Sequence, residues 1–486
     1  MKNKLLSIIL AVAILASLCS MMIVPVSAAT ASSLSTDSEG AYLIQSAADI
    51  EIFRQMLCSG ETFATKTVKL TADITLENDY VYTMDGVQGH GFEGVFDGQG
   101  HTIYNLVVAN SKNNGFFGFF DGDSTNWGYN NDSSTIKNVA FVNSKSISNT
   151  GKTNVGLFYG AVYGATVNVE NVYVDTVMYS PGTSGNMVSS HGGLVGYTYG
   201  MHLNIKNSVL NVKTETAGCT LRGCGAIAGV LDGATANKLT FEQSALFGDV
   251  HFTLTYVAIG AKSGVGAPEV SLTNAIADLK HTTKGDGWNY PCAVGLWKNS
   301  AAIYETANVE VIDVSGLDAD TVEGFTKTVG HLVPTSLLKM FPEHCLEEAD
   351  VTGGILEFEG YQTNNDNKMR LVATIADKDI KNYNSVGFEV VAVYGENVKS
   401  TSFTSKTVYT SIGANTATGD TTISAESLIG ADGYIFAMII GNLPADTPVT
   451  LQVKTFYTDI NDTQTDGSTT VFTVSQMPSG TVSGGK

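Results

Sequence analysis

Short stretches of alternating apolar and polar residues fill the chain between about residues 90 and 315, and glycine or asparagine interrupts them every 6 to 10 residues. Alternation with a period of two, in segments rich in Val, Ile, Thr and Tyr, is typical of β-strands. A short apolar glycine motif recurs at Gly115–Gly118, Gly156–Gly160, Gly193–Gly196, Gly225–Gly229 and Val294–Leu296. The pattern predicts short strands and tight turns that repeat as units.

Asparagine marks the period of these units. It recurs at Asn105, Asn138, Asn171, Asn207 and Asn274, with steps of 33, 33, 36 and then 67 residues, the last passing a weaker unit around Gln243. Strand-rich units of this length predict a parallel β-solenoid, in which each unit forms one coil that stacks about 4.8 Å above the previous one. We expect the asparagines to form a hydrogen-bonded ladder between coils, and glycine to permit the corners.

The interior of the solenoid is expected to be a continuous apolar stack. Its predicted members are Ile103, Leu106, Ile136, Val139, Leu157, Leu194 and Val195. Because a solenoid has open ends, a cap is needed, and apolar residues at helical spacing within 43–59 predict an N-terminal helical cap. Residues 68–76 alternate as a first strand, and residues 335–341 predict a short helix that closes the solenoid or bridges to the next domain. The solenoid with its cap is assigned to residues 41–320 and the linking segment to 321–350.

The sequence pattern changes at about residue 352, where the repeats have ended and longer strand-like stretches begin. Seven strand-like stretches, separated by turn residues, predict a smaller antiparallel β-sandwich of immunoglobulin-like type over residues 351–476. The predicted strands are 354–359, 369–375, 385–394, 407–410, 434–440, 449–457 and 470–474. Residues 477–486 are expected to be a disordered tail. The predicted fold class is therefore all-β: a parallel β-helix with an N-terminal helical cap, followed by a sandwich.

Residues 1–28 have the organisation of a signal peptide. Lys2 and Lys4 precede an apolar run from Leu5 to Met22, and Val26-Ser27-Ala28 supplies small residues for cleavage before Ala29. We expect a secreted or extracellular protein, with association with the cell surface as an option and no transmembrane segment after cleavage. The charge balance, with 27 Lys and Arg against 47 Asp and Glu and a net charge of −20, removes the usual attraction to nucleic acid or anionic membrane.

Five cysteines remain after the signal peptide: Cys58, Cys219, Cys224, Cys292 and Cys345. The odd number and wide spacing do not resemble a disulfide framework, so the favoured interpretation is that they are buried apolar residues. Cys219 and Cys224 are close in sequence. No second pair of cysteines lies nearby, which argues against a zinc site.

One stretch of the repeats carries a resemblance to a known family. Residues 94–106, with the sequence GVFDGQGHTIYNL, together with the glycine motifs at 115–118 and 191–196, resemble the GLUG-type repeats of bacterial surface proteins and adhesins. The resemblance covers about residues 41–315, with the repeats at about 94–315. It implies a right-handed parallel β-helix on an exported bacterial protein. The C-terminal half resembles modules of exported proteins from Gram-positive bacteria.

Parallel β-helices often carry polysaccharide lyases and glycoside hydrolases, so an enzyme is the main alternative function. A hydrolase needs two carboxyl groups about 5 to 10 Å apart. Asp97, Asp121, Asp123 and Asp132 are concentrated on the early coils, although Asp97-Gly98 and Asp121-Gly122 also suit turns. A lyase would need a base, and Arg222 stands without an adjacent carboxylate. The sequence contains neither an H-E-x-x-H nor a G-x-S-x-G motif.

A loop of about a dozen residues after the first glycine motif provides the candidate site. Trp127 and Tyr129 offer flat faces that can stack on sugars, and Tyr163 and Tyr199 follow the glycine motif in the next coils. Tyr159 and Tyr197 are candidate extensions of the same strip. Asp121, Asp123 and Asp132 are candidate ligands for Ca²⁺, the one cofactor the sequence suggests.

These observations predict an exported surface or adhesion-type protein that binds an extracellular glycan or cell-surface ligand without catalysis. A carbohydrate-active enzyme on the β-helix is the alternative. A structural spacer that only positions the sandwich is a third option.

Overall fold

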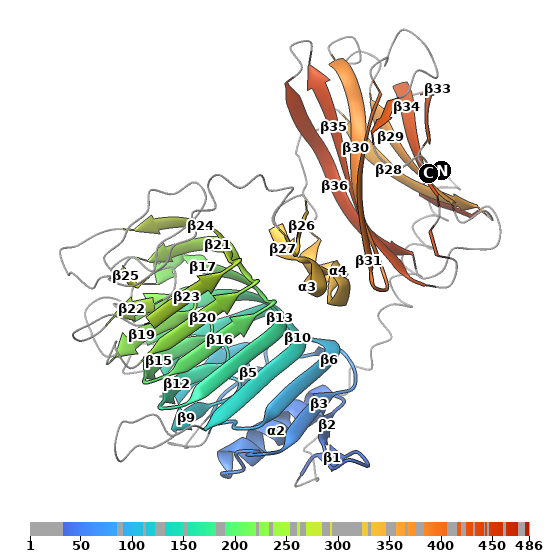
Figure 1. Cartoon of the computed structure of the whole chain (residues 1–486). Helices are drawn as coiled ribbons and strands as arrows, with labels where there is room; N and C mark the ends of the chain where they lie inside the picture. The colour runs from blue at the N-terminus through green and yellow to red at the C-terminus, as the bar shows by residue number, and fades with distance from the viewer. Residues whose placement is uncertain are drawn as a thin grey trace.

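The computed structural model of the chain is shown in Figure 1. It describes residues 33–84, 91–109, 113–121, 132–148, 154–180, 190–219, 223–232, 237–252, 260–262, 269–283, 292–293, 323–328, 332–346, 356–364, 368–375, 383–405, 416–418, 424–430, 433–441, 443–444, 447–459, 463–474 and 482–485. The predicted signal peptide and the motif at 294–296 lie outside these residues. Within them, no helix is long and apolar enough to cross a membrane.

The N-terminal part is a parallel β-helix, which confirms the predicted class. Strands from successive coils pair in parallel, and three sheets run along the coils (Figure 1). The first sheet contains β1 (Ser35–Thr36), β2 (Tyr42–Ile44), β3 (Thr67–Leu70), β4 (Ile74–Thr75), β5 (Val81–Tyr82), β6 (Val95–Tyr104), β7 (Val107–Ala109), β10 (Ser133–Ile147), β13 (Thr166–Ser180), β16 (His202–Lys206), β17 (Val209–Cys219), β20 (Lys238–Glu242), β21 (Ala245–Phe252), β23 (Glu269–Thr273) and β24 (Ile276–Thr283).

The other two sheets are shorter. The second contains β8 (Asn113–Asn114), β11 (Asn154–Val155), β14 (Ser190–Gly192) and β18 (Gly223–Gly225). The third contains β9 (Phe119–Asp121), β12 (Tyr159–Tyr163), β15 (Val195–Tyr199), β19 (Ala228–Asp232), β22 (Gly260–Lys262) and β25 (Cys292–Ala293). The glycine motifs lie where the chain passes from the second sheet to the third. They place Phe116, Phe117, Leu157, Phe158 and Leu194 in the core.

The periodic asparagines occupy one corner of the coils in left-handed backbone conformation. Asn138 has φ 53°, and Asn171, Asn207, Gln243 and Asn274 share this conformation. The Asn171 Nδ2 donates to Asn138 Oδ1 at 3.0 Å, and Asn274 Nδ2 donates to Gln243 Oε1 at 3.3 Å. Asparagine tolerates the left-handed region and can bond its neighbours, which explains its use at this corner.

Asn105 does not belong to that ladder, which corrects the predicted phase. Lys137 pairs with Asp97 and Val139 pairs with His101, so Asn138 lies beside the corner of the previous coil that contains Gln99, and not beside Asn105. Asn105 instead accepts from Asn143 Nδ2 at 2.6 Å, at a second left-handed corner. The sequence step of 33 residues concealed this shift because the coil after residue 121 carries an insertion.

The predicted helical cap is α2 (Ala47–Cys58), which closes the first coil (Figure 1). Ser46 is the N-cap residue, and its side chain accepts from the Asp49 amide. One helix face carries the buried residues Ile50, Phe53, Met56 and Leu57. Phe53 meets the rings of Phe63, Phe92, Phe96, Phe116 and Phe117 at centroid distances of 5.3–6.4 Å. Aromatic packing therefore joins the cap to the first coils.

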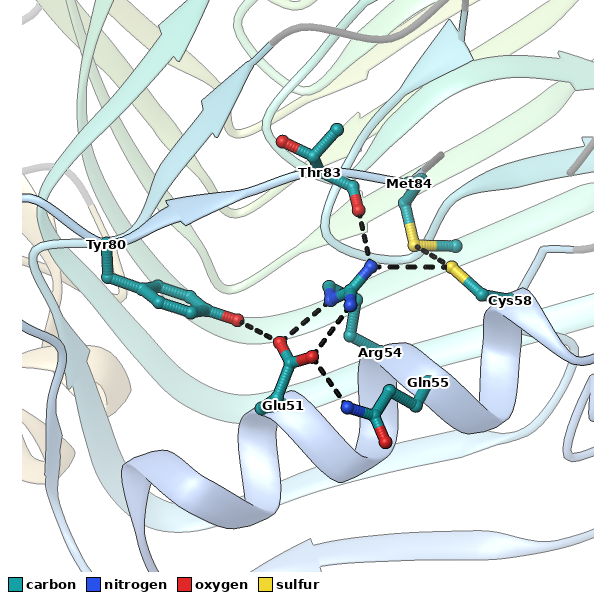
Figure 2. Close-up of polar contacts among 7 residues, drawn as sticks. All are labelled: Glu51, Arg54, Gln55, Cys58, Tyr80, Thr83 and Met84. Atoms are coloured by element: carbon teal, nitrogen blue, oxygen red, sulfur yellow. Dashed lines mark hydrogen bonds and ion pairs between the residues drawn. The ribbon is translucent and has the colours of Figure 1, made fainter. Parts of the chain in front are cut away.

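The polar side of α2 is tied to the chain segment that contains β5 (Figure 2). Arg54 forms two bonds with the Glu51 carboxylate, at 2.7 and 2.8 Å, and donates to Thr83 O at 2.8 Å. Tyr80 donates to Glu51 at 2.7 Å. Burial raises the pKa of Glu51, but hydrogen bonds from Arg54, Tyr80 and Gln55 outweigh this and lower it to about 2. Cys58 lies 3.8 Å from both Arg54 Nη1 and Met84 Sδ.

Glu51→Gln is expected to destabilise the cap at neutral pH, because the Arg54 and Tyr80 donors lose a charged acceptor. The folded pKa of Glu51 lies below its usual value, so its contribution is present above pH 4.5 and is lost as the pH falls toward 2. Urea unfolding at pH 7 and pH 2.5 measures this, and the difference between wild type and variant should shrink at the lower pH. A difference that is equal at both pH values contradicts the prediction. The control is Glu77→Gln, at an exposed glutamate. Gln55 is not used for this purpose because its side chain also bonds Glu51.

The C-terminal part is an antiparallel β-sandwich, as predicted. One sheet has the order β33 (Ser424–Gly430), β34 (Gly433–Ile440), β29 (Lys368–Ile375), β28 (Leu356–Asn364) and β37 (Val482–Gly485). The other has the order β32 (Thr416–Thr418), β31 (Asn397–Ser405), β30 (Tyr383–Tyr394), β35 (Val449–Asp459) and β36 (Gln464–Val474). Apart from β37, this order corresponds to strands D-E-B-A and C″-C′-C-F-G of a variable-type immunoglobulin domain.

Several strands of the sandwich differ from the prediction. The stretches 397–405 and 424–430 form β31 and β33, although their polar residues gave no clear strand pattern. The predicted strand at 407–410 lies outside the described residues. The tail at 477–486 is not wholly disordered, because β37 pairs with β28 through Val482 and Thr363. An edge strand such as β28 offers unpaired backbone groups, which explains how a Gly-rich tail can add to it.

The segment between the domains is an ordered wedge. It consists of β26 (Phe325–Lys327), β27 (Leu332–Pro334), α3 (Thr335–Met340) and α4 (Pro342–Cys345), which lie between the solenoid and the sandwich in Figure 1. Leu337, Leu338 and Phe341 share one apolar cluster with residues of both domains. The predicted short helix over 335–341 therefore bridges the domains along the side of the solenoid and does not close its end.

Candidate functional site

The predicted loop is an insertion at the corner between the third sheet and the first. Asp121 pairs with Tyr163, and Ser133 pairs with Thr166. Eleven residues therefore separate these two register points, whereas the next coil has only Gly164 and Ala165 between them. Asp121 and Asp132 stand at the two ends of this insertion.

Tyr163 and Tyr199 lie side by side at the same corner. They are register partners on β12 and β15, and both are half-buried. Their neighbours in sequence, Val162 and Thr198, are buried on the inner face, so the two tyrosines face outward. Tyr163 contacts Phe119 at a centroid distance of 5.3 Å. The sheet thus places two of the predicted binding tyrosines in one row beside the insertion.

Tyr197 extends this row and Tyr159 does not. Tyr197 contacts the Tyr163 ring at 5.6 Å, and its hydroxyl donates to Asp232 on the next strand. Burial raises the pKa of Tyr197, and the Asp232 carboxylate raises it further. Tyr159 is fully buried; its hydroxyl donates to Phe92 O at 2.9 Å and lies 2.8 Å from the Ser134 hydroxyl, which can donate to it. Its glycine-flanked position resembles that of the others in sequence, but it points into the core.

The remaining candidate residues lie partly inside and partly outside the described part of the chain. Trp127, Tyr129 and Asp123 lie outside the described residues. Asp121 ends β9, and Asp132 is exposed. Among the residues that the structure describes, no group of three or more His, Cys, Asp or Glu side chains could hold a metal ion. The Ca²⁺ hypothesis thus depends on residues 122–131.

Asp97, the other early carboxylate, has a structural role. It accepts from the Gln99 amide at 3.1 Å and from Asn138 Nδ2 at 3.0 Å, and Lys137 Nζ lies 3.4 Å away. Burial raises the pKa of Asp97, but the bonds from Asn138 and Gln99 outweigh this and hold it below its usual value. An ionised carboxylate with these partners is suited to fixing a corner and not to donating a proton, which agrees with its assignment as a turn residue.

Cys224 corrects the interpretation of the cysteines. It is fully buried but forms a disulfide bond, whereas Cys58 and Cys345 are reduced thiols. Cys224 lies on β18 and Cys219 ends β17, which is the one close spacing in the sequence.

The fold and this corner define a two-domain class of protein, a parallel β-helix joined to an immunoglobulin-like sandwich. No protein-family model, curated protein or solved structure matches the chain. The sequence prediction also missed two contacts that the structure brings together: that of Tyr197 with Asp232, and that of the wedge, whose helix was predicted, with the side of the solenoid. Neither has a local sequence signature, because each joins residues that are distant in the chain.

Proposed function

We propose that this is an exported bacterial protein of the GLUG-type repeat class that binds glycan without catalysis. The proposed binding surface is the corner that carries Tyr163 and Tyr199. The observation that carries the proposal is the row of half-buried, outward-facing tyrosines, Tyr163 and Tyr199, in register beside the inserted loop. Tyrosine combines a flat apolar face with a polar edge, which suits a sugar ring and its hydroxyl groups. Trp127 and Tyr129 on the insertion would add to the same surface.

Two further observations support export. The N-terminal 28 residues have the organisation of a signal peptide. Disulfides persist in oxidising compartments, and Cys224 is disulfide-bonded. We infer that the protein works outside the cell, secreted or associated with the cell surface.

A glycan array with wild-type protein and the Tyr163→Ala/Tyr199→Ala variant tests the proposal. Each lost ring is expected to weaken binding by roughly tenfold, which corresponds to about 1.4 kcal/mol and lies within the range of aromatic contacts. Trp127→Ala/Tyr129→Ala should also weaken it. Tyr179→Ala is the matched control, since Tyr179 is half-buried on β13 of an adjoining sheet.

Two results would overturn the proposal. Unchanged binding by both aromatic variants would exclude the corner as the site. Release of reducing ends from plant or host polysaccharides by the wild-type protein would instead establish the carbohydrate-active enzyme, and a protein with neither property would be a spacer.

A further inference from the structure

A column of outward-facing residues on the solenoid forms the surface on which the wedge docks. Ala140, Tyr173, Val209, Ala245 and Ile276 are register partners on consecutive coils, and all belong to the cluster that contains the wedge. On the other side, the wedge meets Val391 and Val393 of β30 and Val471 of β36. Thus one small element holds both domains.

His344 on α4 is the polar residue at the centre of this contact. Its side chain is 7% exposed. Its Nε2 lies 2.9 Å from Thr102 Oγ1 on β6, which continues the column, since Thr102 pairs with Ala140. The imidazole also meets the rings of Tyr104, Tyr173 and Phe341 at centroid distances of 5.9, 5.5 and 6.1 Å. A ring with this environment has little access to water that could solvate a positive charge.

We propose that acid releases the wedge from the solenoid, with His344 as the switch, and thereby uncouples the sandwich from the β-helix. A protonated imidazole would have to keep its charge in a position that is shielded from water, which costs free energy that the undocked, hydrated ring does not incur. The bond to Thr102 does not need the charge, because the neutral ring can make it as donor or as acceptor. Docking therefore favours the neutral form, and protonation favours release.

The charged and titratable groups around His344 are few in the described part of the chain. Glu343 Oε1 lies 3.4 Å from Nε2, and Asp73 is paired with His101 at 3.1 Å. Asp175 on β13 is paired with Lys213 at 3.4 Å. The charged residue of β36, Asp466, is paired with Lys454 at 3.2 Å. The nearby carboxylates thus have other partners or a partly exposed position, apart from the weak contact of Glu343.

Burial lowers the pKa of His344 to about 4, against smaller opposing effects of Asp73 and Asp175. Because the docked pKa lies below the usual value of 6.5, the contribution to docking is complete above pH 6.5 and is lost as the pH falls toward 4. Glu343 opposes this acid release. Burial, and then Asp73, raise its pKa in the docked state, so that its protonation at low pH favours docking. Glu343→Gln should therefore make the acid release steeper.

Hydrogen exchange of the α3 and α4 amides between pH 7.5 and pH 5 tests the switch, with rates normalised to the intrinsic exchange rate at each pH. Protection of these amides is expected to fall about 25-fold over this range, from the two pKa values. His344→Gln can still bond Thr102 but cannot take up a proton, so its protection should not depend on pH in this way. His101→Gln, at a more exposed histidine of β6 that pairs with Asp73, should behave as wild type.

A second measurement keeps the proposal testable if His344→Gln does not dock. The imidazole of His344 in the wild-type protein should titrate well below pH 6.5 by NMR, and the radius of gyration from solution scattering should rise at pH 5. Wild-type protection that is independent of pH, or a His344 that titrates at its usual pKa while the wedge stays docked, would overturn the proposal.

Discussion

Replacing Phe53 with alanine is expected to lower the free energy of unfolding of the solenoid by about 3–5 kcal/mol, the usual cost of truncating a fully buried phenylalanine. Phe53 is fully buried, and five phenylalanine rings surround it. Its removal leaves a cavity between the cap and the first coils, where no neighbouring coil can compensate. Urea unfolding followed by circular dichroism measures the loss.

Gln55→Ala on the same helix is the control for Phe53→Ala. Gln55 is exposed and bonds Glu51 at 2.8 Å, so its loss is expected to cost less than about 1 kcal/mol. If the two variants unfold at the same urea concentration, α2 does not stabilise the solenoid through its apolar face.

Gly193→Ala is expected to disrupt the coil that contains the third glycine motif, with a loss of about 3 kcal/mol or more. A Cβ at this position would lie 2.0 Å from the carbonyl oxygen of Ala226 in the next coil. The obstacle is the backbone of the next coil, which the bond from Gly193 N to Gly225 O at 3.1 Å holds close. The coils would have to separate locally, which urea unfolding and limited proteolysis would detect.

Gly40→Ala separates this contact from backbone strain. Gly40 has φ 85°, which an alanine adopts at a cost of about 1 kcal/mol, but no other side chain or distant backbone atom lies within 4 Å of the place that its methyl group would take. Gly193→Ala should therefore be clearly more damaging than Gly40→Ala. Equal losses would show that the glycine motif does not serve close stacking of the coils.

Much of the solenoid could be predicted because its information is local and repeated. The asparagine ladder at Asn138 and Asn171, the inward Ile136 and Val139, and the capping helix after Ser46 each follow from short-range patterns. Errors arose where an insertion changed the phase. Residues 122–132 moved Asn105 out of the ladder, and a count along the chain cannot distinguish a longer corner from a longer strand.

The candidate site was predictable only in part. Tyr163 and Tyr199 were found because they recur at one place in neighbouring units, and register makes such residues neighbours in space. The same recurrence wrongly included Tyr159, which lies in the core. Tyr159 and Tyr163 are four residues apart on β12, a spacing that places two side chains on the same face of a regular strand, yet Tyr159 is buried and Tyr163 is half-buried.

Local sequence patterns were sufficient for the class of each half: a glycine- and asparagine-punctuated repeat for the β-helix, and alternating strands for the sandwich. How the halves meet was visible only in the folded chain. The column from Ala140 to Ile276 and the side chains of α3 and α4 lie far apart in the chain, and their contact forms only when the coils are stacked. Local patterns specify strands and corners because these depend on neighbouring residues, whereas the docking of the wedge depends on a surface that no single coil possesses.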